Sequence, residues 1–129
     1  MNTKLLMSAS SIILGMAGIA FSFFPKEISG YLGYGENNSI IIQILGSLYF
    51  GFAMINWTAK ANLIGGIYSR PVAIGNFTHF MIGGLALIKL SFSSATQPCI
   101  WIAAIIYSIF AILFGYIFFT NPVSGNKSM

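Results

Sequence analysis

Charged residues are scarce in this sequence. Its 129 residues include six Lys or Arg and two acids, both Glu, so charged residues make up 6% of the chain. A soluble domain carries about a quarter charged residues, whereas 57% of this chain is hydrophobic. The composition therefore excludes an ordinary soluble surface and predicts a protein whose main partner is a lipid bilayer.

Side chains for catalysis and metal binding are nearly absent as well. His79 and Cys99 are the only residues of their kinds, and the chain has no Asp. One His and one Cys cannot form a usual zinc site, and a serine nucleophile would have only His79 as its base. We expect no metal, no cofactor and no catalytic residues. Catalysis by this chain alone has little support, although a subunit of a larger enzyme stays open.

Basic residues occur singly along the chain, and no basic run exists. Nucleic-acid binding through phosphate contacts therefore has little support. The scatter favours a role in marking membrane topology. The six positions are Lys4, Lys26, Lys60, Arg70, Lys89 and Lys127.

Long apolar runs make up most of the remaining sequence. A membrane-spanning helix needs about 20 mostly apolar residues, and four segments qualify. We predict an all-α fold: one integral membrane domain over residues 1–129, built as a bundle of four transmembrane helices with short loops. The expected helices cover residues 5–24, 40–58, 71–92 and 99–119.

The first apolar run also has features of a signal peptide. Lys4 provides a basic start, and Ala20-Phe21-Ser22 has the small-x-small pattern of a cleavage site. The run is longer than a usual signal-peptide core of about 7–15 residues, which favours a membrane span. Residues 25–39 then contain Gly-rich turns or one interfacial helical turn.

Alternate connections fall on the same side of the membrane. One side then holds Lys4, Lys60, Arg70 and Lys127, and the other holds Lys26, Lys89 and both Glu. Lys and Arg favour the cytoplasm, so we predict a multi-pass protein of the inner or plasma membrane with both termini cytoplasmic. Lys60 and Arg70 are most simply interfacial anchors, and the alternative is a site for a lipid headgroup or an anion.

Small residues recur at helical spacing, which marks seams where helices approach closely in lipid. The simpler interpretation is that these residues pack within the bundle, and the alternative is that one stripe forms a homodimer. The stripes are Ser11, Gly15, Gly18 and Ser22; Ser47 and Gly51 with Gly46 beside them; Gly75, His79, Gly83 and Ala86; and Ala104, Ser108, Ala111 and Gly115.

Several polar residues lie at membrane depth. At about 1.5 Å per residue, Asn56, Asn76 and His79 lie roughly 6, 8 and 12 Å inside the core. With Tyr49 and Ser11 they are the candidates for a ligand-binding pocket. Intramembrane polar residues are functional candidates, but amides and hydroxyls often only bond neighbouring helices. For His79 both roles stay open.

Parts of the sequence resemble small four-helix membrane proteins of the DoxX-like kind. The similar parts are Phe24-Pro25 with Tyr31-Leu32-Gly33, the stretch from Gln43 to Tyr49, Asn56-Trp57, and Asn76 through His79. The resemblance implies a four-helix membrane fold. Some such proteins are linked to quinone-dependent oxidoreductase systems or help membrane enzymes, and the resemblance assigns no catalytic residue.

Three functions remain as hypotheses. The first is a non-catalytic accessory subunit or helper that packs against a membrane-protein partner. The second is a small-molecule carrier or channel built by oligomerisation. The third is a binder of a lipid, an isoprenoid or a quinone.

Overall fold

The described residues form helices joined by short turns. The computed structural model describes residues 2–61, 69–93 and 97–120, so Lys127 lies outside the described residues. The all-α prediction is confirmed, and four helices are long and apolar enough to cross a membrane, as in a multi-pass membrane protein. The elements are α1 (Thr3–Phe23), α2 (Pro25–Tyr31), the 3-10 helix η1 (Glu36–Asn38), α3 (Ser39–Ala59), α4 (Arg70–Ser93) and α5 (Pro98–Thr120).

Caps and prolines set the helix ends. The Asn2 side chain accepts a hydrogen bond of 3.1 Å from the backbone N–H of Leu5 and caps α1. Pro25 disfavours helical geometry at the residue before it, so α1 ends at Phe23. Pro71 and Pro98 lie at the starts of α4 and α5, where a missing N–H does no harm. The four long helices thus match the predicted spans to within a few residues.

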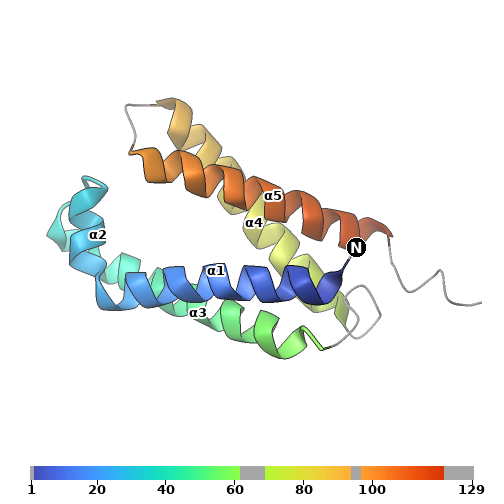
Figure 1. Ribbon diagram of the computed structural model, residues 1–129. Helices are drawn as coiled ribbons and strands as arrows, with labels where there is room; N and C mark the ends of the chain where they lie inside the picture. The colour runs from blue at the N-terminus through green and yellow to red at the C-terminus, as the bar shows by residue number, and fades with distance from the viewer. Residues whose placement is uncertain (1, 62–68, 94–96, 121–129) are drawn as a thin grey trace, which may run out of the picture. The chain divides into compact units, whose positions relative to one another are not determined.

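The connection between α1 and α3 holds more helix than the sequence predicted. Pro25 cannot continue α1 but starts α2, which turns sharply away from α1 (Figure 1). Gly33 and Gly35 then have φ of 82° and 74°, a left-handed conformation that glycine adopts without a steric penalty. The buried Ser29 hydroxyl donates a hydrogen bond to the Gly35 carbonyl and holds this turn against α2.

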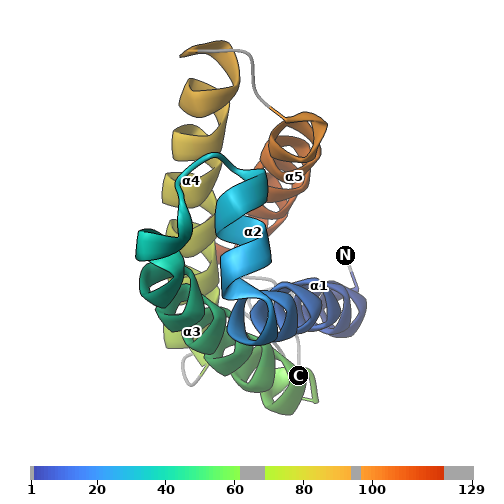
Figure 2. The same cartoon turned by 90° about the vertical axis from the view of Figure 1, so that its left-hand side faces the viewer.

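The chain divides into two compact units, residues 1–61 and 62–129. In the first unit α1 packs against α3, and the two helices lie side by side (Figure 2). A Cβ added at Gly18 would lie 2.7 Å from the Phe50 backbone N, and one added at Gly46 would lie 2.7 Å from the Ser22 backbone N. The two backbones therefore meet at these glycines.

The predicted stripe on the first helix forms this seam. Ser11, Gly15, Gly18 and Ser22 all face α3. On α3 the contact with α1 is made by Gly46, whereas Ser47 and Gly51 of the predicted stripe are exposed. Neighbouring residues of a helix differ by about 100° in direction, so the stripe one position further on faces away from α1.

In the second unit α4 packs against α5. Aromatic rings pack directly against glycines of this unit. A Cβ added at Gly83 would lie 2.7 Å from Tyr107 Cε1, and one added at Gly115 would lie 2.9 Å from Phe77 Cε2. The predicted stripe on the last helix contains Ala104, Ala111 and Gly115, all of which are buried. Rings that pack against glycines thus determine how closely α4 and α5 approach each other.

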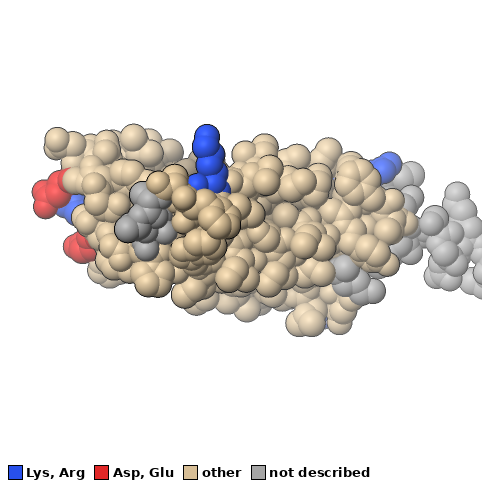
Figure 3. Space-filling view, turned by 90° about the horizontal axis from the view of Figure 1, so that it is seen from above, with Lys and Arg blue, Asp and Glu red and all other residues tan. Residues whose placement is uncertain are grey.

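Many large apolar side chains are exposed on the long helices. Each of the four long helices carries large exposed hydrophobic residues, such as Ile12 on α1, Ile44 on α3, Ile82 on α4 and Ile112 on α5. The face shown in Figure 3 has few charged side chains. Such a surface suits hydrocarbon rather than water.

Candidate functional site

Asn56 lies in the seam of the first helix pair, three residues before the end of α3. It is fully buried, and its Nδ2 donates a hydrogen bond of 3.0 Å to Ser10 Oγ across the α1–α3 seam. Ser10 Oγ in turn donates to the Met7 carbonyl at 3.1 Å. The Asn56 amide is thereby tied through Ser10 to the backbone of α1.

Ser11 makes a second bond across the same seam. Its hydroxyl donates to the Ala53 carbonyl at 2.7 Å, one helical turn before Asn56. The structure thus brings together two of the predicted site residues, Ser11 and Asn56. Both are buried and joined to the facing helix, which is the interhelical bonding role that polar side chains commonly have in membranes.

Tyr49 belongs to the same unit but not to this group. It lies seven residues before Asn56 on α3, which is about 10 Å along the helix. Its ring packs against Phe21, with ring centroids 5.4 Å apart. Tyr49 therefore lies beside the Gly18–Gly46 crossing rather than beside the buried amide.

Asn76 and His79 belong to the second unit and lie on one face of α4. Asn76 is fully buried, and its Nδ2 donates to the Val72 carbonyl of its own helix at 2.9 Å. His79 is half-buried, and its Nε2 lies 3.2 Å from the hydroxyl of Tyr107 on α5. Depending on the imidazole tautomer, either the phenol O–H or the ring N–H donates.

The His79–Tyr107 pair lies among aromatic rings in the middle of its helices. The Phe80 ring centroid is 5.0 Å from each of the two rings, and Phe80 also stacks on Phe110 and Phe114. His79 lies nine residues into α4 and Tyr107 nine into α5, about 14 Å from each helix start. The pair is a half-exposed hydrogen-bonding group in otherwise apolar surroundings.

Lys60 and Arg70 each lie over an aromatic ring of their own unit. Lys60 Nζ is 2.9 Å from the centroid of the Trp57 ring. The Arg70 guanidinium carbon is 5.6 Å from the centroid of the Phe118 ring. Cations within about 6 Å of a ring centroid are attracted to the ring face, so both side chains are held at the ends of their helices.

Sequence reasoning missed three partner residues: Ser10, Tyr107 and Phe118. Ser10 adjoins the candidate Ser11, and a tyrosine in the middle of the last apolar run was a visible signal for Tyr107. Phe118 carried no signal, because phenylalanine is common throughout these runs. Each missed residue lies on the helix facing its partner, so only the pairing of helices identifies it.

The described residues contain no cluster of three or more His, Cys, Asp or Glu that could hold a metal ion. No protein family, curated protein or solved structure matches the chain. The site is therefore interpreted from its own residues.

Proposed function

We propose that this chain is a non-catalytic membrane protein that acts as an accessory subunit or helper of a membrane complex. The observation that supports this most is that Ser10, Ser11 and Asn56 are buried in bonds that join α1 to α3. These side chains stabilise the helix pair. What the long helices offer to their surroundings is mostly apolar surface.

The face of α3 that carries Ser47 and Gly51 is the one we expect a partner helix to pack against. Ser47 and Gly51 are exposed there, and among the described residues no atom outside the neighbouring backbone of α3 lies within 4 Å of a Cβ added at Gly51. Small residues allow close helix approach in lipid, as Gly46 does on the facing side of the same helix. The DoxX-like resemblance agrees with the proposal, since some proteins of that kind help membrane enzymes.

Purification in mild detergent tests the proposal. We expect a stoichiometric membrane-protein partner that Gly51→Leu removes. Ile112→Phe on α5 enlarges another exposed position and is the matched control, which should keep the partner. A stable monomer with no partner, or equal loss in both variants, would contradict this function.

A second candidate is a binder of an isoprenoid, quinone or lipid with a polar head. The His79–Tyr107 pair supports it, because this half-exposed pair could hydrogen-bond a carbonyl or hydroxyl at membrane depth while the surrounding rings contact an apolar tail. Mass spectrometry of the extracted protein tests it. A retained ligand that Tyr107→Phe and His79→Ala both remove is expected, and extraction without any retained ligand counts against it.

The proposed location is the inner or plasma membrane, with both termini in the cytoplasm. Lys4, Lys60 and Arg70 lie at one end of the long helices in a four-span topology, whereas Lys26, Lys89 and both Glu lie at the other. An excess of Lys and Arg favours the cytoplasmic side.

A further inference from the structure

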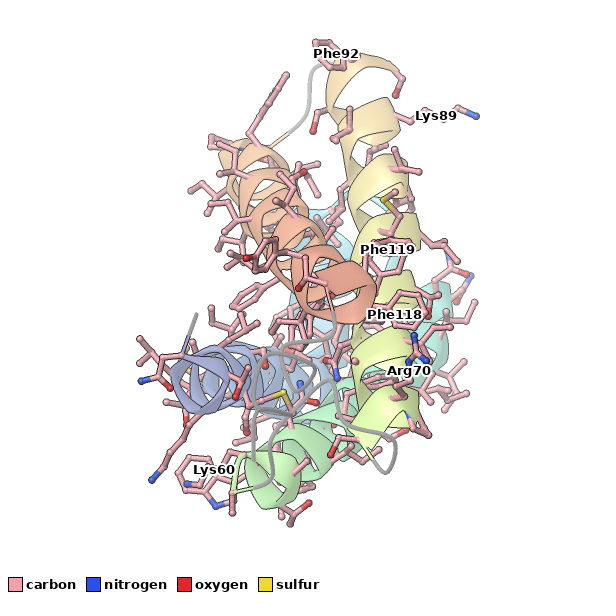
Figure 4. The ribbon with its side chains drawn as sticks, turned by 90° about the vertical axis from the view of Figure 1, so that its right-hand side faces the viewer. Lys60, Arg70, Lys89, Phe92, Phe118 and Phe119 are labelled. Atoms are coloured by element: carbon pink, nitrogen blue, oxygen red, sulfur yellow. The ribbon has the colours of Figure 1, made fainter. Side chains whose placement is uncertain are left out.

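We propose that Arg70 and Phe118 form a binding site for the phosphate group of an anionic phospholipid. Arg70 is the first residue of α4, and Phe118 lies in the last turn of α5. The guanidinium carbon lies 5.6 Å from the ring centroid, and Figure 4 shows Arg70 reaching toward Phe118. The site lies within the second unit and at the end of its helices, where headgroups begin.

The Phe118 ring is held in place by other side chains. Phe77 stacks on it with centroids 6.2 Å apart, and Phe77 also meets the edge of Phe119 at 5.8 Å. Gly115 makes room for Phe77, because a Cβ there would lie 2.9 Å from Phe77 Cε2. The ring therefore gives the guanidinium a fixed surface, which lowers the entropy lost when an anion binds.

The cation–π contact with Phe118 rests on the guanidinium charge and needs none of its N–H donors. Arginine presents five N–H donors in a planar fork that matches a phosphate in two places at once. Arg70 is itself exposed. An exposed guanidinium of this kind is accessible to a phosphate.

Residues 62–129, which form the unit of Arg70, include no Asp or Glu in their sequence. The only acids of the chain are Glu27 and Glu36, and both precede α3 in the first unit, whereas Lys60 follows α3. A spanning α3 of 21 residues separates those ends by about 31 Å. In the proposed four-span topology, Arg70 lies on the side of Lys60 and away from both Glu, and lipid phosphate is abundant there.

Lys89 is the matched control, because it is the other described cation of the second unit. It is exposed near the far end of the same helix, where it points away from α4 (Figure 4). Lysine offers a point charge without a planar fork. Removing Lys89 changes the net charge as much as removing Arg70 does but leaves the Arg70–Phe118 arrangement intact.

Native mass spectrometry of the detergent-purified protein, titrated with phosphatidylglycerol or phosphatidylcholine, tests the site. The wild type should prefer phosphatidylglycerol. Arg70→Gln should weaken phosphatidylglycerol binding about tenfold, as expected for losing charge-assisted hydrogen bonds. Lys89→Gln should leave it unchanged. Phe118→Leu, which keeps the charge but removes the ring, should weaken it about threefold through lost cation–π contact.

Three results would overturn the proposal. Equal losses in Arg70→Gln and Lys89→Gln would show an effect of net charge alone. Equal binding of both lipids would remove the anionic preference, and displacement of phosphatidylglycerol by millimolar inorganic phosphate would assign the site to a free anion. Should Arg70→Gln fail to fold, Arg70→Lys keeps the charge and loses the fork, and its unchanged affinity would equally contradict the site.

Discussion

Tyr107 reaches His79 because Gly83 leaves room for its ring. Gly83 and His79 are four residues apart on α4, so they lie on one face, and the Tyr107 hydroxyl ends 3.2 Å from His79 Nε2. A Cβ at Gly83 would lie 2.7 Å from Tyr107 Cε1. The absence of one methyl group thus permits the hydrogen bond in the second unit.

Gly83→Ala should separate Tyr107 from His79. The added methyl has to displace the ring, and overpacking of this kind typically costs about 1–3 kcal/mol. Thermal unfolding in detergent measures the loss of stability. In a Tyr107→Leu background, where the ring is gone, Gly83→Ala should cost much less. The same cost in both backgrounds would show that the ring and the glycine are not coupled.

Gly46→Ala should be the more damaging substitution. A Cβ there would meet the backbone N of Ser22 at 2.7 Å and the carbonyl of Gly18 at 2.9 Å. Backbone atoms cannot rotate away as a side chain can, so α1 and α3 have to move apart. We expect a loss at the upper end of the overpacking range, about 3 kcal/mol.

Gly51→Ala is the control for that experiment. It makes the same chemical change on the same helix, but no described residue beyond the local α3 backbone places an atom within 4 Å of the added Cβ. It should leave stability unchanged or raise it slightly, since alanine favours helix over glycine by about 1 kcal/mol. Similar losses at Gly46 and Gly51 would contradict the observed seam.

The amide of Asn56 and the hydroxyl of Ser10 should be energetically coupled. Their bond is 3.0 Å long, and interhelical bonds of this kind in membranes average about 0.6 kcal/mol, with a maximum near 1.7. A double-mutant cycle with Asn56→Ala and Ser10→Ala should give a coupling energy within that range. Additive single effects would show that the two side chains act independently.

The length and polarity of the apolar runs were enough to predict the four spans. Hydrocarbon requires about 20 apolar residues in a row, and α1, α3, α4 and α5 lie within a few residues of the expected ranges. Pro25 predicted the end of α1 correctly. Its second effect, the start of α2, was underestimated, because the sequence gives no measure of how long an interfacial helix continues.

Side-chain partners were harder to predict, because they depend on how helices are rotated toward each other. The sequence contained both Gly46 and the neighbouring Ser47 and Gly51, and only the observed pairing shows that Gly46 meets α1. Similarly, Asn56 could be recognised as a costly polar group, but its bond to Ser10 requires the α1–α3 register. Composition predicts which segments form helices, whereas the contacts of the site depend on how those helices are rotated about their axes toward each other.

Cys99 offers a direct test of the proposed topology without any engineering. It is the only cysteine of the chain, and it is exposed in the first turn of α5. With both termini cytoplasmic, that end of α5 lies on the outer side of the membrane. A membrane-impermeant maleimide should therefore label Cys99 in intact cells whose outer barrier, where present, has been opened.

Cys99→Ser should abolish that labelling, and a second variant supplies the opposite result. In a Cys99→Ser background, Thr58→Cys places an exposed thiol at the C-terminal end of α3, one residue from Trp57. It should react only after the membrane is permeabilised, because it lies on the side of Lys60 and Arg70. Labelling of the Thr58→Cys variant in intact cells, together with no labelling of Cys99 in the wild type, would mean that the orientation is inverted. Labelling of both thiols from one side would contradict the crossing of the membrane by α4, which is the one long helix between the two positions.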